Sequence, residues 1–190
     1  MTHNESAALF HSMFPGYFDN PGIRAIPEQY IYDEMILDLR TFDPAAAHAK
    51  LTAPEGIRFG FFEGEIEDLK KSVAEVDESW VKYFNRPELT WCAVDTAEGN
   101  RVVSFCDVSD FGEHLLGGKT VKIGGPGCVG TVPDHRKRGI GLKMVLGATE
   151  ILKNRGYDYS FIHYTGVGPW YAKLGYETIV RWNSKGIVGE

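Results

Sequence analysis

Apolar positions along the chain repeat with two different periods, which predict a mixture of helices and strands from residue 56 onward. Between Ile66 and Tyr83 they recur every three or four positions with charged residues between them, as in an amphipathic helix. The stretch Asp77–Ser79 interrupts this stripe and leaves room for two helices. Short aromatic and apolar runs predict strands at Ile57–Phe62, Thr90–Val94, Val102–Val108, Lys119–Val132, Tyr157–Tyr164 and Tyr176–Trp182.

Glycine and proline mark where these elements end or become irregular. The pattern predicts a helix over Gly139–Lys153 that stops before Gly156, and a short helix over Pro169–Leu174. Glu98–Asn100 is typical of a hairpin turn, and Gly112–Gly118 is interpreted as a glycine-rich loop. Proline and glycine at 124–127 weaken the strand that contains them, so we expect a bulge or a splay there.

The first fifty residues differ from the rest because proline and glycine interrupt them repeatedly. Ser6–Phe14 is expected to form a short helix, and Tyr30–Leu39 fits either a strand or a short helix. We therefore interpret residues 1–50 as an N-terminal extension packed on the core and residues 51–190 as the main domain.

Composition and charge exclude several classes of protein. The three cysteines of the 190-residue chain form no C-x-x-C pair, so neither a disulfide framework nor a thiolate metal site is expected. We find no signal peptide or membrane-spanning run, which predicts a cytoplasmic protein without a membrane partner. The net charge of −6 argues against nucleic acid as a partner. It suits an amine substrate, although it also fits plain solubility.

The strongest chemical signal is the stretch Val132–Gly141, in which a predicted strand passes through a basic loop into a helix that starts with glycines. A helix N-terminus offers free backbone N–H groups and partial positive charge, so it can hold a pyrophosphate. The alternative is a solvated basic loop before an ordinary helix. Neither G-x-x-x-x-G-K-[ST] nor G-x-G-x-x-G fits, because position 144 is Met144.

Two segments together resemble the GNAT (GCN5-related N-acetyltransferase) superfamily. Arg136-x-x-Gly139-x-Gly141 is similar to the turn that binds the acetyl-CoA pyrophosphate, and Trp170-Tyr-Ala-Lys-Leu-Gly-Tyr176 is similar to a second motif of the family. The resemblance covers roughly residues 56–182. It implies an α/β (α+β) fold with a mixed, mostly antiparallel twisted sheet, flanked by helices and splayed between its fourth and fifth strands.

The resemblance also implies roles for single residues. Tyr171 corresponds to the tyrosine that often protonates the departing thiolate of CoA, and a buried packing aromatic is the alternative. Thr165 stands where the family often has an asparagine that helps to hold pantetheine. The residues implied in cofactor binding are Val129, Thr131, Arg136, Lys137, Arg138, Gly139, Ile140, Gly141, Leu142 and Thr165.

One family feature is missing, and one other residue is a candidate for its role. Many members carry a glutamate base four residues before the position of Val129, where this chain has Gly125. His163, on the strand before the second motif, could accept an amine proton, or it could be a core histidine bonded within the protein. Cys128 is interpreted as packing, since most members attack directly from the amine.

These observations predict an N-acetyltransferase that moves an acetyl group from acetyl-CoA to a small primary amine by direct attack, without a metal. A non-catalytic acyl-CoA-binding module is the main alternative. A glucosamine-type amine is our first choice of acceptor, with polyamines, amino acids, aminoglycosides and protein N-termini open. Homodimerisation also stays open.

Overall fold

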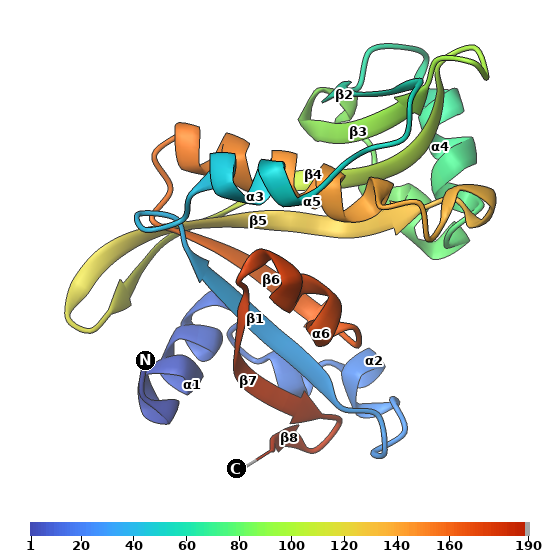
Figure 1. The fold of residues 1–190 in the computed structure, drawn as a ribbon. Coiled ribbons are helices and arrows are strands. Elements are labelled where there is room, and N and C mark those ends of the chain that lie inside the picture. The colour runs from blue at the N-terminus through green and yellow to red at the C-terminus, as the bar shows by residue number, and fades with distance from the viewer. Residues whose placement is uncertain (189–190) are drawn as a thin grey trace.

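The computed structural model describes residues 1–188, which form one eight-stranded sheet with helices on both faces (Figure 1). The strands lie in the order β2-β3-β4-β5-β6-β1-β7-β8, and every neighbouring pair is antiparallel except β5 and β6. The strand bounds are β1 Tyr32–Asp38, β2 Ile57–Phe61, β3 Thr90–Asp95, β4 Arg101–Leu116, β5 Lys119–Thr131, β6 Tyr159–Thr165, β7 Glu177–Asn183 and β8 Gly186–Ile187. This mixed, mostly antiparallel sheet confirms the predicted fold class.

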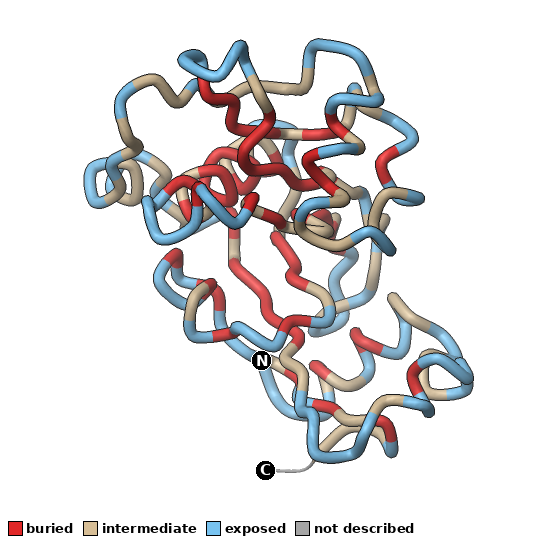
Figure 2. Tube along the Cα trace, turned by 90° about the vertical axis from the view of Figure 1, so that its right-hand side faces the viewer, coloured by how far each residue is buried: buried red, intermediate tan, exposed pale blue. Residues whose placement is uncertain are grey.

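Two sets of helices cover the two faces of the sheet. On one face, the apolar side of α5 packs on β4, β6 and β1 together with α3 and α6. On the other face, α4 covers β3 and β4, while α1 packs on β1, β5 and β6. Figure 2 shows the buried residues gathered toward the inside of the trace, with exposed segments around them. The helix bounds are α1 His3–Met13, α2 Pro21–Arg24, α3 Pro44–Lys50, α4 Ile66–Ala74, α5 Ile140–Asn154 and α6 Gly168–Tyr171.

Short 3₁₀ turns complete the chain, and one of them corrects a prediction. The turns are η1 Tyr17–Asp19, η2 Glu78–Tyr83, η3 Pro87–Leu89, η4 Pro133–His135 and η5 Ala172–Leu174. The break in the apolar stripe at Asp77–Ser79 is confirmed, because α4 ends before it and η2 follows. The second half of the stripe is therefore a 3₁₀ turn rather than an α-helix.

The prediction of a loop at Gly112–Gly118 is wrong. β4 continues to Leu116 and pairs with β5, so only Gly117 and Gly118 form the turn, both with positive φ. Hydrogen bonds from β5 keep the glycine-containing segment extended, and a bulge near Phe111 takes up the irregularity. The resulting hairpin projects beyond the rest of the sheet in Figure 1.

The parallel pair β5–β6 is short, and the sheet splays beyond it as predicted. Only Ile123↔Tyr159 and Gly124↔Ser160 are paired, after which the two strands diverge (Figure 1). A bulge in β5 lies opposite Cys106, and Cys128 within it has φ 47°. The splay and the bulge follow from the Gly–Gly–Pro–Gly segment, which lacks both a ladder donor and space-filling side chains.

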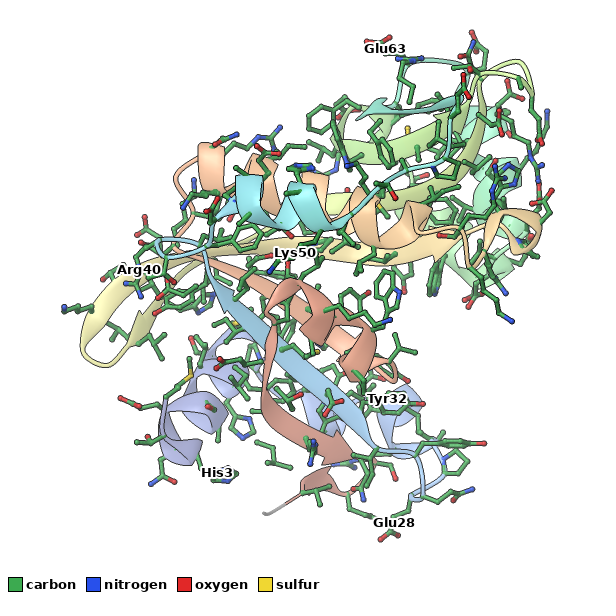
Figure 3. The ribbon with its side chains drawn as sticks, viewed as in Figure 1. His3, Glu28, Tyr32, Arg40, Lys50 and Glu63 are labelled. Carbon is green, nitrogen blue, oxygen red and sulfur yellow. The ribbon has the colours of Figure 1, made fainter. Side chains whose placement is uncertain are left out.

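The N-terminal residues are part of the sheet. β1 is the strand form of the two alternatives for Tyr30–Leu39, and it lies between β6 and β7. α1 confirms the helix predicted at Ser6–Phe14, and its capping box joins Thr2 to Glu5. Arg40, labelled in Figure 3, marks where the chain leaves β1 and turns toward α3. Residue 50 is thus no boundary of the sheet, and the division into 1–50 and 51–190 stays a proposal.

Candidate functional site

The turn between β5 and α5 leaves the first amides of a long helix without side-chain caps. Gly139 is the N-cap of α5 with φ 80°, and no side chain bonds to the free N–H groups. Lys137 also has a positive φ, so the basic loop curls back before the helix begins. Free amides and the helix dipole together favour an anion at this point.

Glycine is required at both marked positions of this turn. A Cβ on Gly141 would lie 2.8 Å from the Thr131 hydroxyl oxygen and 3.4 Å from the Trp170 ring. A Cβ on Gly139 would lie 3.3 Å from the Thr52 carbonyl in a backbone conformation that L-residues rarely adopt. The pair therefore keeps the backbone open where a phosphate would approach it.

A groove of about 640 Å³ runs from this turn to α6. It brings together eight of the ten residues predicted to bind the cofactor and the predicted acid Tyr171, and it also includes apolar and basic neighbours. Its lining consists of Val76, Val129, Gly130, Thr131, His135, Arg136, Lys137, Gly139, Ile140, Gly141, Leu142, Val167, Trp170, Tyr171 and Lys173. A second hollow of about 700 Å³ beside β1 and β7 contains none of the predicted site residues.

The three basic side chains of the turn differ in their contacts with the protein. Arg136 donates from Nε to the Thr131 carbonyl oxygen at 2.9 Å, so it partly braces the loop. Lys137 and Arg138 are exposed, and Arg138 does not line the groove. Thr165 is buried and accepts a hydrogen bond from the Val167 amide at 3.1 Å, which holds the start of α6. Cofactor contacts of Arg138 and Thr165 stay predictions.

Tyr171 lies in the wall of the same groove and is almost completely buried. Burial is the main reason why its pKa is raised well above the ordinary value, with Tyr176, Cys106 and Cys128 adding to the effect. Its hydroxyl therefore stays protonated at neutral pH and can donate a proton or a hydrogen bond. Cys128 lies near it, and burial raises the pKa of that thiol to about 11, which makes it a weak nucleophile.

The position that carries a glutamate in many GNAT proteins has no room for one here. A Cβ on Gly125 would lie 1.9 Å from the Phe161 carbonyl oxygen and 3.0 Å from the Phe111 ring. Gly125 thus permits the closest approach of β5 to β6, and the missing base follows from the packing of the strands.

His163 lies apart from the groove, on the face of the sheet that α1 covers. Its ring stacks on Phe14 with centroids 4.1 Å apart, and its Nδ1 is 2.9 Å from Oε2 of Glu34 on β1. Glu34 was missed in the sequence because it and Asp33 form an acidic pair directly before the apolar run Met35–Leu37. That acidic pair was the only local signal.

A cluster of charges supports the entrance to the basic loop. His135 is buried, with Nδ1 3.0 Å from Asp134 and Nε2 3.2 Å from Asp95. Arg101 also bonds Asp134, and the two donors lower the pKa of that carboxyl to about 2. Ligand atoms of Asp95, Glu98 and His135 lie within 4.8 Å of one another. Because both ring nitrogens already face carboxylates, the cluster ties η4 to β3 and β4.

Comparison with known proteins identifies the family to which these features belong. A model described as "Acetyltransferase (GNAT) domain" matches residues 63–179, which is more than half of the chain. Curated proteins give no significant match. No helix within residues 1–188 is long and apolar enough to cross a bilayer.

Two solved structures share the fold at low sequence identity. One is a region of a fungal multi-domain GH3 beta-N-acetylglucosaminidase, described as a GCN5-related glucosamine N-acetyltransferase region. It is 22% identical with a TM-score of 0.66, and the match covers 82% of this chain and 20% of that one. A GCN5-related N-acetyltransferase from Sphaerobacter thermophilus is 23% identical with a TM-score of 0.59, covering 80% and 50%. This chain therefore spans at most half of the length of either structure.

Proposed function

The chain belongs to the GNAT family of acetyltransferases, and from that premise we propose that it transfers an acetyl group from acetyl-CoA to a small primary amine. The groove that joins the uncapped start of α5 to Tyr171 carries the proposal. Backbone amides from Gly139 to Leu142 would hold the pyrophosphate, and the bulged strand beside Val129 would align pantetheine. The amine attacks the thioester directly, and Tyr171 protonates the leaving sulfur.

An amino sugar is our preferred acceptor. The fungal region with the same fold is described as acting on glucosamine, and this motivates a test with glucosamine before other amines. The absence of a carboxylate at Gly125 favours a second candidate, an acyl-CoA-binding module without catalysis. The three unpaired cysteines suit the cytoplasmic location that we propose.

Ligand-dependent melting and CoA release test the proposal and separate the two candidates. At one hundred times its dissociation constant, acetyl-CoA should add about 2.7 kcal/mol of stability and raise Tm by roughly 5–10 °C. An acetyltransferase should also release CoA with at least one amine from a panel led by glucosamine. Stabilisation without release would favour the binding module, and no stabilisation at millimolar acetyl-CoA would contradict both.

Variants of Gly139 test whether the turn is the phosphate site. Gly139→Glu adds negative charge and bulk at the free amides, so acetyl-CoA should no longer raise Tm. Gly139→Ala is the matched control, because it has the same unfavourable φ without the charge and should keep a measurable shift. Equal shifts in both variants would place the phosphate elsewhere.

A further inference from the structure

A buried histidine beside the basic loop faces carboxylates with both of its ring nitrogens. The side chain of His135, in η4, is only 3% exposed. Its Nδ1 lies 3.0 Å from Asp134 Oδ1, and its Nε2 lies 3.2 Å from Asp95 Oδ2 at the end of β3. A neutral imidazole carries one N–H and one lone pair, so it cannot donate to both carboxylates. The arrangement therefore needs a positive charge at the ring, supplied by a second proton or by a bound cation.

A further carboxylate at the same nitrogen favours the cation over the proton. Glu98 Oε1 lies 3.7 Å from Nε2 of His135, and these two atoms and Asp95 Oδ2 all lie within 4.8 Å of one another. A proton on Nε2 would be donated to Asp95 and would leave Glu98 close by but too far away for a hydrogen bond. A metal ion takes all three atoms as ligands at once, so it accounts for both carboxylates.

The two carboxylates from the β3–β4 turn are each held by their other oxygen. The Ala97 amide donates to Asp95 Oδ1 at 2.9 Å, and Arg101 donates to Glu98 Oε2 at 2.9 Å. The turn itself is closed by the Asn100 amide, which donates to the Asp95 carbonyl oxygen at 3.0 Å. Asp95 Oδ2 and Glu98 Oε1 are therefore the oxygens that this turn presents to His135.

The histidine is supported in the same way. With its proton on Nδ1, His135 donates to Asp134, whose Oδ2 accepts a hydrogen bond from Arg101 at 3.0 Å. This proton position leaves the lone pair on Nε2, the nitrogen that faces Asp95 and Glu98. A carboxylate behind a histidine that binds through its other nitrogen is a common arrangement in metal sites, because it fixes the ring and makes it a better ligand.

The charges around this point also favour a cation. The carboxylates gathered here are those of Glu75, Asp95, Glu98 and Asp134. The guanidinium of Arg101 bonds three of them, so negative charge remains for a divalent ion to offset. The side chain of Glu98 is 43% exposed, which gives an ion a path from solvent to the buried His135.

We infer that Asp95 Oδ2, Glu98 Oε1 and His135 Nε2 bind one divalent ion of the Zn²⁺ type, with water completing its coordination. One imidazole nitrogen with two carboxylate oxygens suits Zn²⁺ better than Mg²⁺, which prefers oxygen ligands. Ligands at about 2.0–2.1 Å from a tetrahedral ion lie about 3.3 Å apart, close to the 3.2 and 3.7 Å found here. The ion has a structural role: it joins the β3–β4 turn to η4 and to the groove wall that His135 lines.

Zinc titration of the chelator-treated protein tests the inference with a matched pair of variants. Glu98 and Glu75 are 43% and 42% exposed, and both accept a hydrogen bond from Arg101, but Glu75 is not part of the ligand cluster. Glu98→Gln should weaken Zn²⁺ binding at least about tenfold, whereas Glu75→Gln should bind Zn²⁺ as the unchanged protein does. Isothermal titration measures both affinities. Equal affinities in the two variants would overturn the inference.

Two measurements on the unchanged protein need no variant to fold. Zn²⁺ at one hundred times its dissociation constant should raise Tm by roughly 5–10 °C, and Mg²⁺ at the same concentration should raise it less. Nitrogen NMR should show that Zn²⁺ shifts the Nε2 signal of His135 while Nδ1 keeps its proton. A ring that carries both protons and does not respond to Zn²⁺ would show that a proton takes the place of the ion, and would overturn the inference. These measurements contain no acetyl-CoA, so their outcome is independent of the proposed transfer.

Discussion

At the scale of single residues, two tyrosines of one motif occupy environments that predict opposite roles. The Tyr176 hydroxyl bonds both Thr149 and Ser160, at 2.8 and 2.6 Å, so its hydrogen-bonding capacity is used within the core. The Tyr171 ring lies 6.1 Å from that of Tyr176 but lines the groove, and no hydrogen bond of its hydroxyl occurs within residues 1–188. We therefore expect Tyr176 to act on stability and Tyr171 on chemistry.

Removing each hydroxyl in turn tests this contrast. Tyr171→Phe should lower kcat by a factor on the order of 10²–10⁴ with little change in Tm. Tyr176→Phe should lower stability by about 1–2 kcal/mol, or roughly 3–6 °C in Tm, and leave the rate per folded molecule nearly unchanged. Steady-state CoA release and melting curves of both variants measure the two effects. Wild-type turnover by Tyr171→Phe would show that another group protonates the sulfur.

At the scale of elements, two glycines of β5 differ in how tightly their neighbours approach. Gly125 lies against the backbone of β6, whereas a Cβ on Gly127 would make only an ordinary contact with the Ser109 hydroxyl oxygen, at 3.7 Å. β5 stays close to β6 as far as Gly125, and the pairing of the two strands does not continue beyond Pro126.

Alanine substitutions at the two positions should show this difference in packing as a difference in Tm. Gly125→Ala forces β5 away from the Phe161 carbonyl and should cost about 1–3 kcal/mol, or roughly 3–10 °C in Tm. Gly127→Ala adds the same methyl group where it makes only an ordinary contact with Ser109 and should change Tm by no more than about 2 °C. Thermal melting of both proteins decides the matter. An equal fall in Tm in the two variants would show that the packing at Gly125 is no tighter than the packing at Gly127.

The sequence predicted elements well where the signal was local. The turn from Val132 to Gly141 was recognisable because every part of it lies within ten residues. The helix at Pro44–Lys50 was overlooked although Asp43 caps it and alanines fill it. By contrast, the contact of His163 with Glu34 joins residues 129 positions apart, and only the strand order brings them together. The extension of β4 through Gly112 likewise depends on its pairing with β5.

At the scale of the whole molecule, β1 joins the C-terminal strands into one sheet. It pairs with β6 along one edge and with β7 along the other. Its side chains Met35 and Leu37 belong to the core under α5, and Ile36 belongs to the core under α1. A domain that started at residue 51 would lack this strand and the contact of Glu34 with His163.

Shortened chains test how far the N-terminal residues are separable. Residues 51–190 alone should lack a cooperative melting transition, because β6 and β7 would each have an unpaired edge and an open core. A chain of residues 31–190 retains β1 and should melt cooperatively at a lower temperature, since the cover from α1, η1 and α2 is lost but the sheet is complete. Calorimetry distinguishes these cases. Cooperative melting of residues 51–190 would instead support the proposed division at residue 50.

The place of β1 between β6 and β7 has a consequence for the order of folding during synthesis. Its partners, such as Thr165 for Asp33 and Trp182 for Tyr32, leave the ribosome more than a hundred residues later. Contacts of such sequence separation form slowly, because a long loop must close before they are made. The hairpins β3–β4 and β4–β5 can pair as they emerge, while both edges of β1 are still unpaired. We therefore expect β1 of the nascent chain to be open to pairing with another chain until β6 and β7 have been synthesised.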